Sequence, residues 1–365
     1  MNRKERRRRR SLASQAERRG PNENEANNAP RTLDPTPTLD TKVQKAASTT
    51  SRSLFHYTTA AGLVGILQTQ SLFATHANFL NDSAECRILR ELLKPELTRE
   101  IAEIVPELIR QQVLKEEIYK EHGAKIHEMQ AEKVLDSMFV ALEKIAPFYI
   151  CSFCLHDRAE PEYENGLLSQ WRGYANGGFA IEFDELALDE LAKRENATFQ
   201  YQGLLTETVS YDDHRDRAKL DQFNGLGRAM LRVLFEDVNG DQYDFGKTRF
   251  ESFTRPFLSI LPFLKDPGFS EEREYRIAAL CNRPGVQAPD DNRKPKKVFF
   301  RESKGGAVVP YIQLFAGLDE GLPIKGILIG PHSNQDNQAT ALQLLLDQCK
   351  IDATVRRSKL TFRQT

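Results

Sequence analysis

A histidine, a tyrosine and a threonine follow one another in the segment LFHYTT, and these side chains could bind a sugar. If the segment is a strand, His56 and Thr58 point to one face while Tyr57 points to the other. An imidazole beside a hydroxyl is suited to holding a ribose or another polyhydroxylated group. The simpler alternative is that His56 only caps a neighbouring loop.

Two carboxylates and a guanidinium occur close together in the segment FSEEREYRIAAL. A strand from Arg273 onward would project Glu272, Glu274 and Arg276 from one face. They could form a surface ion-pair ladder of little energetic value. They could equally be a catalytic carboxylate with its orienting partners. Because the strand runs directly into apolar residues, we expect its start to lie at the rim of a cavity.

A third polar block contains CSFC followed by LLSQWRGYANGG. Cys151 and Cys154 have the spacing of a zinc-binding pair, but a single pair in an apolar strand favours two buried structural cysteines. Trp171 stands beside Arg172 and close to Tyr174, which could make a stacking platform for a planar ring. A core anchor is the equally open interpretation of Trp171.

The segment NDSAE could support a site or could simply begin a helix. Asp82 is a typical N-cap with Glu85 three residues later, whereas Asn81, Asp82 and Glu85 together could line a loop beside the site. The chain contains no Walker loop, no G-x-S-x-G elbow and no H-x-x-x-H pair. We therefore expect no metal site and no serine hydrolase.

The N-terminal residues are strongly basic. Residues 1–20 contain nine lysines and arginines, Arg6–Arg10 among them, against two glutamates, although the whole chain has a net charge of −1. Such a tail could bind nucleic acid through phosphate contacts, or it could only aid solubility. Residues 20–51 are rich in Asn, Pro, Thr and Ala, so we expect residues 1–52 to be a disordered tail and linker.

The composition is that of a globular protein, with 40% hydrophobic and 28% charged residues. No apolar run approaches the roughly 18 residues that a membrane span needs, and no apolar stretch follows the basic start as in a secretory signal. Five scattered cysteines do not suggest a disulfide framework. We expect a cytoplasmic protein that has no contact with a membrane.

Residues 53–365 show short strands and helices that interleave without a regular βαβ rhythm. This pattern predicts a single α+β domain with a mixed, mostly antiparallel sheet. Residues 84–146 are charged and periodic, which indicates a helical insertion, and we expect Pro95 and Pro106 to break it into pieces.

Taken in order, these blocks resemble an uncharacterised bacterial family, the domain of unknown function numbered 2971. The resemblance rests on His56-Tyr57, the N-D-x-x-E loop, Ser152-Phe153, Trp171 to Ala175, Ile181 to Asp184, and the E-x-E-x-R block that ends at Arg276. It spans about Ser53 to Phe362, and only the ordered set is specific.

A weaker resemblance concerns the ADP-ribosyltransferases. LFHYTT looks like the His-x-Ser/Thr strand of that superfamily, and REYRI is similar to its late strand with the catalytic glutamate. The resemblance implies an ADP-ribosyltransferase-like fold in which His56 binds NAD, Glu274 is catalytic and Glu272 orients the acceptor. Tyr57 replaces a glycine of one branch, and Phe73 or Tyr57 would have to stand in for the tyrosine that stacks on nicotinamide.

Two functions therefore stay open. The first is an enzyme that transfers ADP-ribose from NAD to a macromolecule, as a toxin or phage-defence effector, with Thr58, Trp171, Tyr174 and Arg276 near the cofactor. The second is a non-enzymatic module that binds nucleic acid or protein through the basic tail. We expect His56 and Glu274 to face one cleft in the first case.

Overall fold

The computed structural model describes residues 52–80, 85–112, 114–145, 147–176, 178–211, 223, 257, 259–281, 291–303, 305–331 and 334–360. All of these lie in one compact unit, residues 50–365. The tail predicted over residues 1–52 lies outside the described residues, apart from Arg52.

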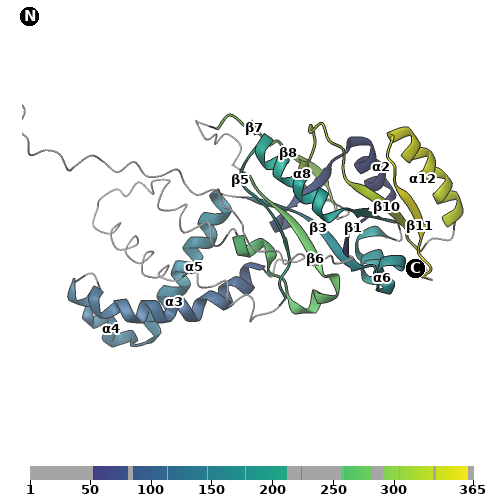
Figure 1. Cartoon of the computed structure of the whole chain (residues 1–365). Helices are drawn as coiled ribbons and strands as arrows, with labels where there is room; N and C mark the ends of the chain where they lie inside the picture. The colour runs from purple at the N-terminus through teal and green to yellow at the C-terminus, as the bar shows by residue number, and fades with distance from the viewer. Residues whose placement is uncertain are drawn as a thin grey trace, which may run out of the picture. The chain divides into compact units, whose positions relative to one another are not determined.

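Eleven strands in the described part of the chain form a mixed, mostly antiparallel sheet (Figure 1). The strands are β1 Arg52–Thr58, β2 Leu72–His76, β3 Phe148–Asp157, β4 Phe179–Phe183, β5 Phe199–Thr208, β6 Glu274–Cys281, β7 Lys294–Pro295, β8 Val298–Glu302, β9 Val308–Leu314, β10 Ile324–Ile329 and β11 Thr354–Arg357. Eight of them run in the order β11-β10-β4-β1-β3-β2-β9-β8, while β6 branches from β3 and pairs with β5. Only β10 with β11 and β5 with β7 are parallel pairs in this part. The predicted α+β class with a mostly antiparallel sheet is confirmed.

The sheet divides at β3, because two strands share one of its edges. One edge of β3 pairs with β6 along its length, from Phe148 to Cys154. On the other edge β1 pairs only from Cys154 onward, and β2 pairs only at Tyr149 and Ile150. Ser152 therefore lies between the ends of β1 and β2. The backbone groups on this edge are free to bond with side chains.

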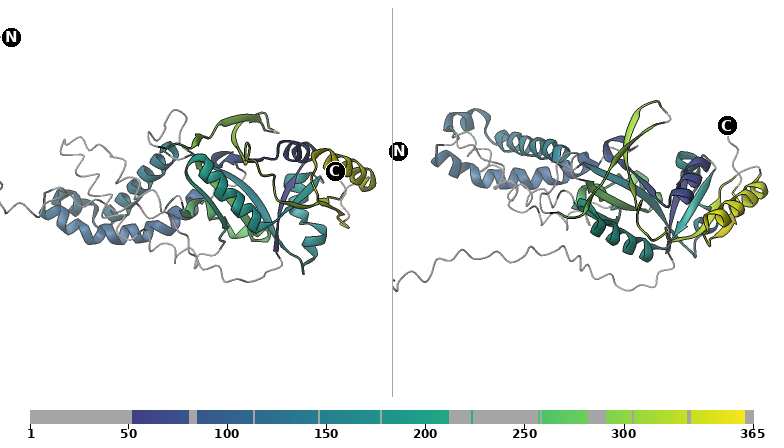
Figure 2. Two further views of the ribbon diagram at one scale, coloured as in Figure 1. Left: turned by 45° about the horizontal axis from the view of Figure 1, so that its top comes forward. Right: turned by 90° about the horizontal axis from the view of Figure 1, so that it is seen from above.

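Helices cover both faces of the sheet (Figure 2). The helical segments are α2 Ala60–Thr69, η2 Ala77–Phe79, α3 Glu85–Arg110, α4 Glu116–His122, α5 Lys125–Ile145, α6 Pro161–Asn165, α7 Leu168–Gln170, η3 Trp171–Ala175, α8 Glu185–Thr198, η6 Leu261–Phe263, η7 Pro267–Glu272 and α12 Gln335–Cys349. Leucines of α2, α8 and α12 form the main core against one face. A second core joins α3 and α5 to Phe148 and Leu280 on the other face. None of the helices in the described part is long and apolar enough to span a membrane.

Helix α3 corrects the prediction that two prolines would break the insertion. It continues from Glu85 to Arg110 with Pro95 and Pro106 inside it. An interior proline costs a helix roughly 3 kcal/mol, because it removes a hydrogen bond and crowds the preceding turn. Its apolar stripe, which includes Leu93, is buried against α5. Tertiary packing of this stripe stabilises the helix more than the prolines destabilise it.

Gly166 precedes Trp171 in a position that only glycine fits well. Its φ is +72°, and an added Cβ would lie 2.5 Å from the Trp171 ring. We expect Gly166→Ala to lower the free energy of unfolding by roughly 2 kcal/mol or more, from left-handed strain and overpacking. Urea denaturation measures the change. Gly173→Ala is the control, since a Cβ added there would meet nothing within 4 Å, and equal losses in both variants would contradict the prediction.

Candidate functional site

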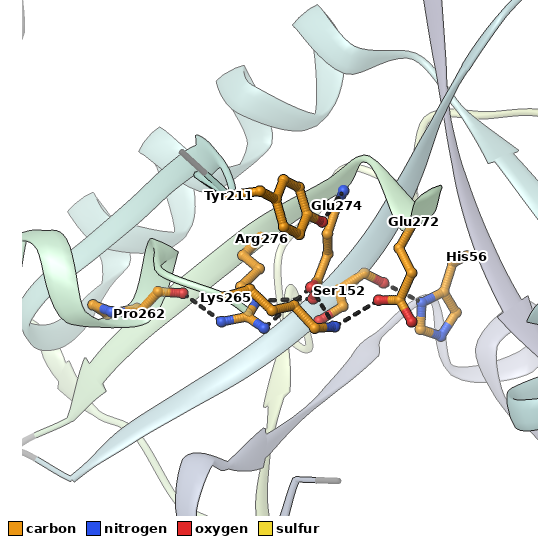
Figure 3. Close-up of polar contacts among 8 residues, drawn as sticks. All are labelled: His56, Ser152, Tyr211, Pro262, Lys265, Glu272, Glu274 and Arg276. Atoms are coloured by element: carbon orange, nitrogen blue, oxygen red, sulfur yellow. Dashed lines mark hydrogen bonds and ion pairs between the residues drawn. The ribbon is translucent and has the colours of Figure 1, made fainter. Parts of the chain in front are cut away.

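Four charged side chains form a buried ion cluster, defined here as Lys265, Glu272, Glu274 and Arg276 (Figure 3). Arg276 donates to both oxygens of Glu274, from Nε at 2.8 Å and from Nη2 at 3.1 Å. The Lys265 ammonium lies 2.5 Å from Glu272 and 3.0 Å from Glu274, so it joins the two carboxylates. The predicted association of the two glutamates with Arg276 is therefore present, but it includes a lysine that was not predicted.

The ion cluster is enclosed, which excludes the surface ladder. Each of the four residues is at most 9% exposed. Burial alone would raise the pKa of Glu274, but the charges of Arg276 and Lys265 more than offset it and lower the pKa below its usual value. Burial alone would also lower the pKa of Lys265, and the two carboxylates raise it instead. Two cations and two carboxylates thus face one another in the interior.

The backbone around Glu272 differs from the predicted strand. Residues Pro267–Glu272 form the turn η7, and Arg273 then adopts a left-handed conformation with φ of 39°. The strand therefore begins at Glu274 rather than at Arg273. Glu272 reaches the cluster from a turn, and Glu274 and Arg276 reach it from alternate positions of β6.

Lys265 is held in place by the end of β5 and the turn η6. Its backbone N–H donates to the carbonyl of Ser210, whose own N–H donates to Phe263. The carbonyl of Pro262 in η6 accepts a 2.7 Å bond from Arg276. Tyr211, which the sequence pattern also did not predict as a site residue, accepts a hydrogen bond from the Glu274 backbone N–H at 3.0 Å. No local spacing marks these partners, because they meet Glu274 only after the chain folds back on itself.

Ser152 connects the ion cluster to His56. Its hydroxyl bonds to the Glu274 carboxylate. Its backbone carbonyl lies 2.9 Å from His56 Nδ1 on β1, where β1 has separated from β3. A carbonyl only accepts, so His56 Nδ1 carries the hydrogen and Nε2 has a free lone pair. Burial lowers the pKa of His56, partly opposed by this bond, so the ring is neutral near pH 7.

Tyr57 and Trp171 lie in the interior. The Tyr57 hydroxyl accepts from Leu167 N–H at 2.8 Å and lies 2.8 Å from His156 Nε2. Its ring packs edge-on against Trp171, which is 0% exposed and donates from Nε1 to Asn165. The core-anchor interpretation of Trp171 describes this position, and the stacking interpretation does not. Tyr57 is likewise a packing residue.

Other predicted residues differ in accessibility. Arg276 is held by Glu274 and Pro262 inside the protein, so it positions the carboxylate instead of offering a cofactor contact. Tyr174 is exposed, and Thr58 is half-buried. Asn81 and Asp82 lie outside the described residues. Glu85 is the first described residue of α3.

Phe73 has the accessibility that a stacking residue needs. Its ring is 43% exposed. In the register of β2 with β3, Thr75 is opposite Ile150, so Phe73 lies level with Ser152 beyond the last pair. Since side chains alternate along strands, Phe73 and the Ser152 hydroxyl belong to the same face of the sheet. Phe73 thus lies on the face of the sheet that carries the Ser152 hydroxyl and Glu274, whereas the register of β1 places His56 on the opposite face, from which it reaches the Ser152 carbonyl.

The two cysteines of CSFC are buried free thiols on opposite faces of β3. Cys151 belongs to the main core, and Cys154 packs near Tyr57 and Trp171. Burial raises the pKa of Cys151 to about 12. The expected burial of both cysteines is confirmed. Within the described residues, no group of three metal-ligating side chains is present.

Comparison with known proteins gives a match over part of the chain. No curated protein and no solved structure matches the chain. The model of the family described as "Protein of unknown function (DUF2971)" matches residues 170–277. This range contains Trp171 to Ala175, Ile181 to Asp184 and the E-x-E-x-R block, three of the features on which the expected resemblance rests. Over residues 170–277 the chain is therefore similar to the DUF2971 family.

Proposed function

We propose that the protein is an ADP-ribosyltransferase-like enzyme that takes NAD as substrate and modifies a macromolecule. The observation that carries the proposal is the meeting of His56 and Glu274 at Ser152. These residues come from β1, β6 and β3, so the sequence separates groups that the fold brings together. A neutral imidazole bonded to the Ser152 carbonyl and an ionised carboxylate bonded to the Ser152 hydroxyl suit the binding and cleavage of a ribosyl group. Such an activity would suit a toxin or phage-defence effector.

The proposed roles follow from the protonation states. The free lone pair of His56 Nε2 accepts a hydrogen bond from a ribose hydroxyl. The C–N bond between ribose and nicotinamide breaks, nicotinamide leaves with the electron pair, and positive charge develops on the ribose. The negative charge of Glu274 stabilises that oxocarbenium-like centre. The acceptor nucleophile then bonds to the same carbon and releases its proton.

The hydrogen bonds of Glu274 limit how substrate can bind. Its two oxygens already receive two bonds from Arg276, one from Lys265 and one from Ser152, which fills the roughly four acceptor positions of a carboxylate. A ribose hydroxyl therefore replaces one donor, and Ser152 is the uncharged one. Glu272 receives its bond from Lys265 on one oxygen, which suits the proposed role in orienting an acceptor. Phe73 supplies the exposed ring for nicotinamide.

Nicotinamide release from NAD tests the proposal. We expect Glu274→Gln to lower kcat by at least about 100-fold, because a neutral amide no longer stabilises the developing charge. Glu272→Gln is the matched control, since it removes the same charge from the same ion cluster. It should retain release of nicotinamide to water while losing transfer to an acceptor.

The outcomes separate the roles of the two carboxylates. Thermal unfolding of both variants shows whether they keep the fold. Equal rates for Glu274→Gln and the unaltered protein would remove Glu274 from the mechanism. Loss of release only in Glu272→Gln would assign the catalytic role to that residue. Absence of nicotinamide release from the unaltered protein with any acceptor would overturn the function.

A further inference from the structure

Three aromatic rings lie across neighbouring strands on one exposed face of the sheet. We call this surface the aromatic face. It consists of Phe73 of β2, Tyr311 of β9, Phe299 and Arg301 of β8, and Lys297 just before β8. The register pairs Phe299 with Tyr311, and Tyr311 with Thr75, so these side chains share a face. In the right-hand view of Figure 2 the yellow-green β8–β9 hairpin projects away from helix α8.

The rings form a continuous apolar strip. The centroids of Phe73 and Tyr311 lie 4.3 Å apart, and those of Tyr311 and Phe299 lie 5.7 Å apart in a stacked arrangement. Phe73 remains 43% exposed, while Phe299 and Tyr311 are half-buried. Strand β8 ends the strand order of the sheet, so its outer edge has no neighbouring strand in the described part. The strip is therefore open to a ligand that lies along it.

Cations border the aromatic strip. Lys297 lies 5.1 Å from the centre of the Phe299 ring, and Arg301 donates to Thr75 at 3.2 Å. Both are exposed. On this face of β2, β8 and β9 the alternating positions are Phe, Thr, Phe, Arg, Val, Tyr and Gln, with no carboxylate among them. The charge of this surface is thus positive, whereas the chain as a whole has a net charge of −1.

We propose that the aromatic face binds single-stranded nucleic acid. Unpaired bases stack on aromatic rings whatever their sequence, and nearby cations bind the phosphates that follow. The strip supplies rings on adjacent strands, and Lys297 and Arg301 supply the phosphate contacts. A duplex hides its base faces and cannot use the rings in this way. The proposal shares the Phe73 ring with the proposed nicotinamide contact but does not require NAD chemistry, and it is separate from the basic tail at Arg6–Arg10.

Fluorescence anisotropy of the full chain with a labelled oligothymidylate or oligouridylate of about 12 nucleotides tests the proposal. We expect Phe299→Ala to weaken binding about tenfold through loss of one stacked base. Arg301→Glu, which changes an exposed side chain, should weaken binding at low salt by a similar factor and reduce the salt dependence. The two oligonucleotides distinguish DNA from RNA as the ligand.

Matched variants provide the controls. Phe300→Ala changes an exposed ring on the same strand but on the opposite face, and Lys359→Glu makes the same charge change elsewhere. Both should bind as the unaltered chain does. Replacing Arg6–Arg10 with serine should remove part of the salt-sensitive binding but leave the effect of Phe299→Ala. Three results would each overturn the proposal. They are equal affinity of Phe299→Ala and Phe300→Ala, tighter binding of duplex than of single strand, and a dimer, detected by sedimentation, that occupies this face.

Discussion

Lys265→Met is expected to lower the free energy of unfolding by about 3–5 kcal/mol, the usual cost of breaking a buried ion pair. Methionine fills a similar volume but removes the positive charge that lies 2.5 Å from Glu272 and 3.0 Å from Glu274. Arg276 would then face two buried carboxylates alone. One uncompensated negative charge would remain in an enclosed site. Urea denaturation at neutral pH measures this loss.

A second substitution distinguishes charge imbalance from lost packing. Lys265→Met combined with Glu272→Gln leaves Glu274 and Arg276 as a neutral pair, so we expect it to regain most of the lost stability. Lys193→Met is the surface control, because Lys193 pairs with Glu190 in solvent and should change stability by less than about 1 kcal/mol. If the double variant is as unstable as Lys265→Met, the loss comes from packing and the electrostatic explanation is wrong.

Acidification from pH 7 to pH 4 is expected to destabilise the protein by about 3 kcal/mol through His156 alone. Burial, followed by the charge of Arg273, lowers the pKa of His156 to about 4 from an ordinary 6.5. His156 therefore binds a proton near pH 6.5 in the unfolded chain but only near pH 4 in the folded protein. The stability that the neutral His156 ring contributes is complete above pH 6.5 and is lost as the pH falls towards 4. Protonation would put a hydrogen on both ring nitrogens, so Nε2, which lies 2.8 Å from the Tyr57 hydroxyl, could then only donate.

His156→Gln tests this dependence, since the glutamine amide cannot titrate and its oxygen can still accept from Tyr57. We expect the unfolding free energy of this variant to fall less steeply between pH 6.5 and pH 4. A residual slope should remain, because burial also lowers the pKa of His56. Lowered carboxylate pKa values such as that of Glu274 act in the same direction, with stability lost as the pH falls through the folded-state value. Identical slopes in the two proteins would exclude His156 as the cause.

Local sequence patterns predicted the elements well. The strands expected at LFHYTT, CSFC and REYRI correspond to β1, β3 and β6, and the charged, periodic residues 84–146 contain helices α3, α4 and α5. Such patterns succeed because side-chain periodicity records which face of an element is buried. Local rules failed at two places. Packing against α5 keeps the helix intact at Pro95, and a left-handed residue at Arg273 delays the start of the strand.

By itself, the sequence determined which residue types alternate along each strand, and hence that Glu274 and Arg276 share a face. Only the tertiary structure decided their neighbours. Ser152 meets both His56 and Glu274 because β1 leaves β3 at that level, and Lys265 enters through a turn nine positions before Glu274. Trp171 is enclosed for the same reason, since burial depends on which distant segment covers a ring. Strand register and the packing of remote segments, which no local spacing records, assemble the candidate site.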